Sequence, residues 1–228
     1  MSMKKMIILG TAHGENVGGK RSPDKRLEEY RFSREIVARL KSELEAAGCT
    51  VYVDLPSDRV PTPQTEELRT RCAIVNDLCK KYGRENCLYV SIHVNAAGGD
   101  GEWKQAGGWC AYTSRGQTTA DLLADSLYHA AEDNLRCYAR LMEAGKKQGS
   151  YGQLQRPIRI DLSDGDRDIE ADFYVLKHTA CAAVLTENLF MDNRSDVDFL
   201  LSDAGKRAIV GLHKEGILNF IHQQHGNG

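Results

Sequence analysis

Apolar residues along this chain fall into short continuous runs separated by longer stretches with a helical period. Each run is apolar or β-branched and is bounded by turn-forming residues, as expected of a buried strand. We predict four such strands, at residues 6–10, 50–53, 87–94 and 182–186.

Helical periodicity fills the intervals between these runs. From Phe32 to Leu44 an apolar residue recurs at every fourth position. Gly48 follows where such a helix would end, which predicts a helix at residues 30–47. The same kind of pattern predicts helices at residues 66–82, 119–145 and 204–221.

Strands that alternate with helices indicate βαβ units, in which the strands form a parallel sheet and the helices cover it. The chain has 228 residues, of which 41% are hydrophobic, enough for the core of one such domain. We therefore expect an α/β fold, a single domain with a mostly parallel twisted sheet and helices on both faces. Residues 94–108 and 149–172 are polar and irregular, and we expect them to rim a site at the carboxyl edge of the sheet.

Composition argues against several classes of function. The formal net charge is −2, so no overall basic field favours nucleic acid or an anionic membrane. No stretch approaches the roughly 20 apolar residues of a transmembrane helix, and the apolar run near the N-terminus is too short for a signal peptide. The seven cysteines include no CxxC pair, which favours buried thiols over a cysteine zinc site. We expect a protein that is made in the cytoplasm and binds no nucleic acid.

Ionisable residues follow three of the predicted strands. His13 comes directly after the first strand and His93 ends the third, so both imidazoles are expected at one edge of the sheet. Glu28 and Glu29 lie at the start of the first helix, whose N-terminus faces the same edge in a right-handed βαβ unit. Two imidazoles and one carboxylate leave the fourth tetrahedral position open, the pattern of a catalytic zinc site. Glu187 follows the fourth strand and would supply acid–base chemistry.

Each of these residues taken alone also has a purely structural interpretation. A histidine after a strand is more often hydrogen-bonded within the fold than bound to a metal, and carboxylates in the first turn of a helix are favoured by the helix dipole. Glu187 alone is compatible with an ordinary loop position. The convergence of these residues on one sheet edge is what favours the metal site.

Five segments of the chain carry a resemblance to a known family. They read IILGTAHG, EYRFSREIVARLKSELEAAGCTVYV, RCAIVND, LYVSIHVNA and VLTENLFMDN. They resemble the zinc-dependent N-acetylmuramoyl-L-alanine amidases of type 3, peptidoglycan-lytic enzymes that cleave the bond between N-acetylmuramic acid and the L-alanine of the stem peptide. The match runs from Lys4 to Phe220, and SIHVN and VLTENLFMDN are its most specific parts. The resemblance implies a phosphorylase/hydrolase-like fold and a hydrolase that acts on peptidoglycan with Zn²⁺ as its cofactor.

The resemblance also implies roles for individual residues. His13, Glu29 and His93 match the three zinc ligands, in that order. Glu187 matches the catalytic glutamate, and Asn95 matches an asparagine near the site. The chain departs from the family pattern after His13, where GENVGGKRSPDKR stands in place of a shorter, acidic, glycine-rich segment.

We assign residues 1–228 to one catalytic domain without a separate cell-wall-binding domain. Such a protein would reach the wall after release or export, as an endolysin or an autolysin does, and we favour phage or prophage lysis. Arg167 and His178 precede the fourth strand, and both are candidates for binding the developing oxyanion or a substrate carboxylate, although structural roles are equally compatible. The sequence leaves the oligomeric state open.

Three other functions are compatible with parts of the sequence. Residues 14–20 fit GxxxxGK, the start of a phosphate-binding P-loop, but Arg21 stands where Ser or Thr would bind magnesium, and Pro23 indicates a turn. A zinc peptidase or deacylase acting on another amide would use the same metal site and the same glutamate. A metal-free binding module would need none of the four candidate residues, and their presence argues against it.

Overall fold

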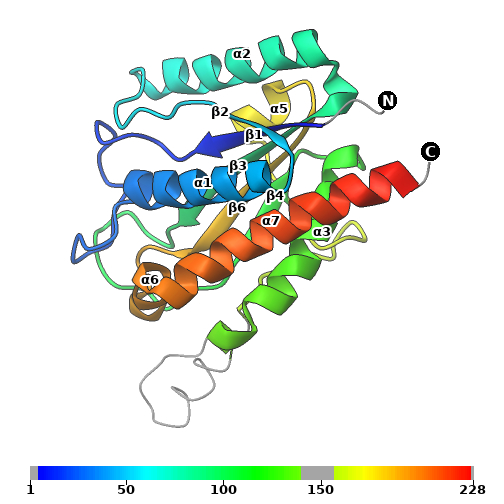
Figure 1. Cartoon of the computed structure of the whole chain (residues 1–228). Helices are drawn as coiled ribbons and strands as arrows, with labels where there is room; N and C mark the ends of the chain where they lie inside the picture. Colours follow the sequence, from blue (N-terminus) through cyan, green and yellow to red (C-terminus); the bar gives the residue numbers. More distant parts are fainter. Residues whose placement is uncertain (1–4, 140–156, 227–228) are drawn as a thin grey trace.

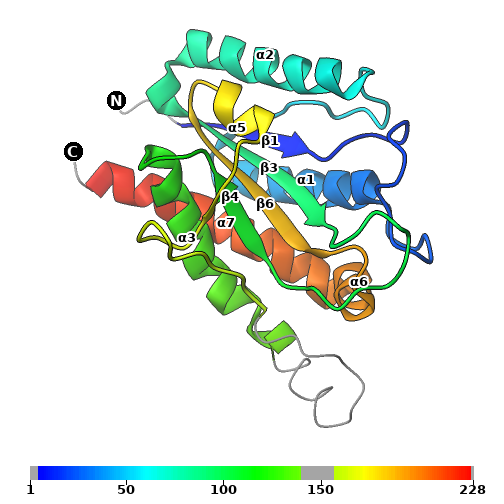
Figure 2. The same cartoon turned by 180° about the vertical axis from the view of Figure 1, so that it is seen from behind.

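A computed structural model of the protein describes residues 5–139 and 157–226. Its centre is one sheet made of β1 (Met6–Thr11), β2 (Thr50–Val53), β3 (Cys87–Asn95), β4 (Cys110–Thr113), β5 (Ile169–Glu170) and β6 (Ala182–Phe190). The strand order is β2-β1-β3-β6-β4-β5 (Figures 1 and 2). The first four strands in this order run parallel, β4 runs antiparallel to β6, and β5 runs parallel to β4. The fold is α/β with a mostly parallel sheet in a single domain, as predicted.

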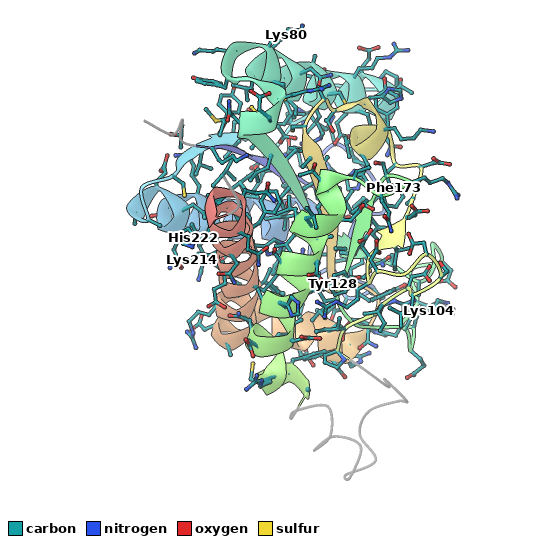
Figure 3. All side chains as sticks on the ribbon, turned by 90° about the vertical axis from the view of Figure 1, so that its right-hand side faces the viewer. Lys80, Lys104, Tyr128, Phe173, Lys214 and His222 are labelled. Atoms are coloured by element: carbon teal, nitrogen blue, oxygen red, sulfur yellow. The ribbon has the colours of Figure 1, made fainter. Side chains whose placement is uncertain are left out.

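Helices cover both faces of this sheet. They are α1 (Glu29–Ala46), α2 (Gln64–Tyr82), α3 (Thr119–Asn134), α5 (Tyr174–His178), α6 (Arg194–Leu201) and α7 (Asp203–Gly226), with a 3₁₀ turn η1 (Arg84–Asn86) before β3. Alternate residues of β1 show the two layers. Ile7 and Leu9 pack into the core beneath α1, α3, α6 and α7, whereas Met6 and Ile8 pack beneath α2 and α5. The side view in Figure 3 shows α2, which carries Lys80, on the opposite side of the sheet from α3 and α7.

The apolar runs predict the four parallel strands to within a few residues. β3 and β6 extend beyond the predicted ends, to Asn95 and Phe190, because polar residues interrupt the apolar pattern while the strands continue. The helix predicted at 119–145 is α3 as far as Asn134, and its last residues, 140–145, lie outside the described part of the chain. Residues 149–156 of the predicted irregular segment lie outside it as well.

Four short elements are not predicted by the sequence pattern: β4, β5, α5 and α6. β5 has two residues, too few for any strand pattern, and β4 (CAYT) is not a continuous run of strongly apolar or β-branched residues like the predicted strands. β4 and β5 extend the sheet beyond β6, so the antiparallel edge is the part of the topology that the alternation of strands and helices misses. Within the described residues, no helix has both the length and the apolar character needed to span a bilayer.

At Gly205, the backbone at the start of α7 packs directly against the backbone at the end of α6. A Cβ atom at this position would lie 1.9 Å from the carbonyl oxygen of Phe199, so the two helices pack this closely only with glycine here. We expect Gly205→Ala to lower the free energy of unfolding by about 1–3 kcal/mol, because the backbone of α6 or α7 must shift.

Denaturant unfolding followed by circular dichroism measures this effect. Gly99→Ala is the matched control, because a Cβ at Gly99 meets no atom within 4 Å. Equal stability of the two variants would contradict the close packing at the α6–α7 turn.

Candidate metal centre

His13 lies in the loop that follows β1, and an arginine of α1 is hydrogen-bonded to the backbone of this loop. His13 has a φ of 40°, in the left-handed region that few residues other than glycine adopt. The Arg34 guanidinium donates hydrogen bonds to the carbonyl oxygens of Ala12, at 3.0 Å, and of His13, at 2.8 Å. These two bonds stabilise a strained conformation that turns the His13 imidazole toward the next strand, β3.

A buried serine on α1 links this loop to β3. The Ser33 hydroxyl accepts a hydrogen bond from the Ala12 amide at 2.8 Å and donates one to the carbonyl of Ile92 at 2.6 Å. Ala12 precedes His13 and Ile92 precedes His93, so one hydroxyl fixes the backbone beside both histidines. Ser33 also lies one helical turn after Glu29, on the same face of α1.

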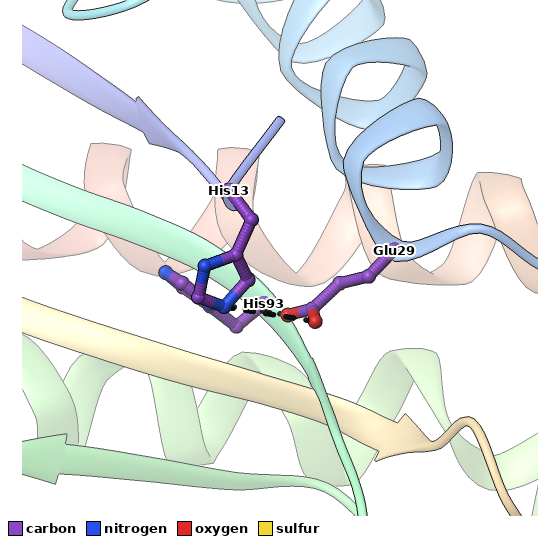
Figure 4. A group of neighbouring side chains, drawn as sticks. All are labelled: His13, Glu29 and His93. Carbon is purple, nitrogen blue, oxygen red and sulfur yellow. Dashed lines mark hydrogen bonds and ion pairs between the residues drawn. The ribbon is translucent and has the colours of Figure 1, made fainter. Parts of the chain in front are cut away.

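Glu29 is the first residue of α1, and its side chain is only 2% exposed. Its Oε1 accepts a hydrogen bond from the amide of Val94 at 3.1 Å and lies 3.2 Å from His93 Nδ1. Its Oε2 lies 3.8 Å from His13 Nε2. The carboxylate therefore bridges the two imidazoles, as Figure 4 shows.

The three side chains lie close enough together to be candidate ligands of one metal ion. One ligand atom from each of His13, Glu29 and His93 can be chosen so that all lie within 4.8 Å of one another, the only such group of three or more in the described residues. His13 Nδ1 and Glu29 Oε2 are buried without a hydrogen-bond partner in the structure, which is unusual for buried polar atoms and is expected where an ion is the partner. Two imidazoles and one carboxylate are a donor set that zinc accepts, with one position left for water or substrate.

Burial affects the ionisable groups of the cluster differently. It lowers the pKa of His13 to about 3, so this imidazole is neutral at physiological pH, the form that binds a metal. Burial alone would raise the pKa of Glu29, but the hydrogen bond to His93 and the electrostatic interaction with His93 hold that pKa below its usual value. Glu29 is thus an anion opposite two imidazoles.

Glu187 lies beside His93 on the neighbouring strand. The parallel register of β3 and β6 pairs His93 directly with Glu187, and both line one cavity of about 230 Å³ together with His13. Burial, reinforced by the nearby Glu29 carboxylate, raises the pKa of Glu187 well above its usual value. Its Oε2 is buried without a hydrogen-bond partner in the structure. A raised pKa makes the Glu187 carboxylate a stronger base, and the proton that it accepts can then be passed on.

Other walls of this cavity come from residues that the sequence analysis does not single out. Lys20 enters from the loop after β1, Arg71 from α2, and Phe173 and Tyr174 from the start of α5. Arg71 is fully paired, because its guanidinium binds the buried carboxylates of Asp54 and Glu67. Lys20 lies in the basic segment that departs from the family pattern, and Arg71 opens the segment RCAIVND, but neither pattern shows that the side chain faces the cavity.

Glu29, and not Glu28, joins the cluster. Glu28 is the N-cap of α1, and its partly exposed carboxylate pairs with Arg31. Asn95 ends β3, and its side-chain oxygen accepts a hydrogen bond from the following amide, that of Ala96.

The structure does not bring the remaining candidates into the cavity. Arg167 forms ion pairs with Asp125 and Glu132 of α3, on the other side of the sheet. His178 is exposed at the end of α5, where its ring packs against Tyr174. Substrate binding by these two residues stays a prediction without structural support.

The P-loop alternative is wrong for residues 14–20. A P-loop requires a helix that begins at its lysine. In the structure Arg21 instead pairs with Glu28 in a short bridge, the carbonyl of Lys20 accepts the amide of Glu29, and α1 begins only at Glu29.

Comparisons with known proteins agree with this geometry. A family model described as N-acetylmuramoyl-L-alanine amidase matches residues 7–219. The endolysin of Bacillus phage SPP1 is 26% identical over 228 residues, which cover 99% of this chain and 69% of the endolysin. The N-acetylmuramoyl-L-alanine amidase CwlM of Bacillus licheniformis is 25% identical over 213 residues, 92% of this chain and 66% of CwlM. The chain thus spans about two thirds of the length of these relatives.

The fold is also that of a solved amidase. The crystal structure of N-acetylmuramoyl-L-alanine amidase from Clostridium difficile 630 superposes with a TM-score of 0.73 at 18% identity, covering 97% of this chain and 98% of that one.

The two adjacent glutamates at the start of α1 provide a direct test of the cluster. We expect Glu29→Gln to weaken zinc binding by at least about a hundredfold, because it removes the one anionic donor of the group. Glu28→Gln is the matched control and should bind zinc as the wild type does. Isothermal titration calorimetry with zinc, on variants whose folding is verified by circular dichroism, measures both. Normal zinc binding by Glu29→Gln would contradict the assignment.

Proposed function

Because the chain belongs to the N-acetylmuramoyl-L-alanine amidase family, we propose that it uses zinc to hydrolyse the amide between N-acetylmuramic acid and the L-alanine of the peptidoglycan stem peptide. The observation that carries the zinc part is the convergence of His13, Glu29 and His93, with Glu187 in the same cavity. The family supplies the substrate, since the cluster by itself would act on any amide carbonyl held beside it.

His13, Glu29 and His93 would hold the ion, and Glu187 would transfer the protons. When bound, zinc supplies a Lewis acid that polarises the scissile carbonyl and makes water a better nucleophile. Glu187 accepts a proton from the attacking water as the bond from oxygen to the carbonyl carbon forms. It then donates this proton to the alanine nitrogen as the carbon–nitrogen bond breaks, so that a carboxylic acid and a free amine leave.

The environment of Glu187 suits this double task. Its raised pKa makes the carboxylate a stronger base toward water, and its protonated form can donate a proton to the leaving amine. Phe173 and Tyr174 line the cavity on the α5 side with partly exposed aromatic rings, which could contact the substrate.

The similarity to a phage endolysin favours a lytic role. In this role the protein degrades the cell wall after release or export from the cell that makes it. An autolytic role would use the same reaction and the same site.

Digestion of purified peptidoglycan tests this function. The zinc-loaded protein should release free L-alanine amino termini, identified by mass spectrometry after labelling of new amines, and a chelator should abolish their release. Glu187→Gln should retain zinc but lose about 10²–10⁴-fold in turnover, because the proton carrier is absent.

His93→Ala is the contrasting variant, since it should lose zinc and turnover together. New amino termini other than alanine would indicate a different amidase or peptidase. A Glu187→Gln variant with wild-type lytic activity would falsify the assignment of the proton carrier.

A further inference from the structure

We propose that Lys20 recognises a carboxylate in the peptide part of the substrate and thereby sets the specificity of the enzyme; this inference rests on the proposed function. The carboxylate is the one nearest to the scissile amide, the α-carboxyl of the second residue of the stem peptide. Lys20 would act as a binding residue, separate from the proton transfer at Glu187.

The backbone places Lys20 next to the metal cluster. Its carbonyl accepts a hydrogen bond from the Glu29 amide at 3.0 Å. An antiparallel β-bridge between Arg21 and Glu28 lies directly beside this bond. The same short hairpin therefore fixes both the anionic ligand and Lys20. The Lys20 side chain is half-buried and lines the cavity that holds His13, His93 and Glu187.

Lys20 is the cation of this cavity that the fold leaves available. Arg71, the other cation in the cavity wall, is bound by the carboxylates of Asp54 and Glu67. Within residues 5–139 and 157–226, no ion pair or side-chain hydrogen bond involves Lys20, although its ammonium group interacts electrostatically with Glu29 and Glu187. A partly desolvated ammonium group without a close partner is expected to bind an anion.

Charge balance in the cavity points to an anionic ligand. When the site is loaded, the positive charges of a divalent ion and Lys20 exceed the negative charges of Glu29 and an ionised Glu187, so the cavity keeps a net positive charge. Phe173, Val175 and Leu185 supply much of the remaining wall, and none of them compensates a cation. A loaded cavity is thus cationic at one wall and apolar at another.

The chemistry of the substrate identifies the carboxylate. The lactyl carboxyl of N-acetylmuramic acid is consumed in the scissile amide, and the carboxyl of L-alanine is consumed in the next peptide bond. The second residue, D-glutamate, is linked through its γ-carboxyl, so its α-carboxyl is free unless it is amidated. This group is the first anion along the peptide from the scissile bond, one residue beyond the L-alanine whose amide is cleaved.

Two peptides that differ in this single group test the proposal. They are N-acetylmuramoyl tetrapeptides in which the α-carboxyl of D-glutamate is either free or amidated. We expect the wild-type protein to cleave the free-carboxyl peptide with a kcat/KM about ten- to a hundredfold higher, the range expected for one hydrogen bond between charged groups. Lys20→Met should abolish this preference, mainly through KM, so that its kcat/KM values for the two peptides become equal.

Two further variants make the result specific. Lys25→Met changes an exposed lysine of the same loop and should keep the wild-type preference. Lys20→Arg should restore much of the preference that Lys20→Met loses. Circular dichroism verifies that Lys20→Met is folded.

Other outcomes overturn the proposal. Equal cleavage of both peptides by the wild type, or an equal loss of kcat with both peptides in Lys20→Met, would place Lys20 outside carboxylate recognition while the proposed function stands. Failure of the zinc-loaded wild type to release alanine amino termini from either peptide would overturn the proposed function itself, and this inference with it.

Discussion

The Ser33 hydroxyl joins the three parts of the chain that carry the candidate metal ligands. It accepts from the amide of Ala12 and donates to the carbonyl of Ile92, and each of these residues is adjacent to a histidine of the cluster. Ser33 is fully buried on α1, one turn after Glu29. Both hydrogen bonds satisfy backbone groups that water cannot reach, so their loss would leave buried polar atoms unpaired. The loop after β1, the start of α1 and the end of β3 are therefore held as one unit.

Within this unit, two carboxylates a short distance apart have opposite properties. Glu29 is hydrogen-bonded to a backbone amide and faces two imidazoles, which holds its pKa low despite its burial. Glu187 is buried without such partners and faces the Glu29 charge, which raises its pKa. Two neighbouring carboxyl groups with separated pKa values are typical of active sites in which one group stays charged and the other transfers protons. The fold thus provides one carboxylate suited to a metal and one suited to a proton.

The sequence predicts the parallel core of the fold and the site residues that follow its strands, because strand ends and helix starts converge on one sheet edge. His13 and His93 are found in this way. The choice of Glu29 over Glu28 rested on resemblance, and the structure brings Glu29 into the cluster by burying it. Ser33 and Lys20 could not be predicted, since a serine on a helix and a lysine in a polar loop have no distinctive pattern. Arg167 is the opposite case, a candidate that the structure places outside the cavity. Its ion pairs with α3 depend on tertiary packing, which the sequence pattern does not show.

The central claim is that three side chains positioned by Ser33 hold a zinc ion beside Glu187. A crystal structure of the zinc-loaded protein, with anomalous data collected on both sides of the zinc absorption edge, tests it most directly. The account predicts one anomalous peak bounded by His13, Glu29 and His93, with the Glu187 carboxyl facing it across the cavity. An anomalous peak at other residues, or none while Glu29 keeps its contacts with both histidines, would contradict it.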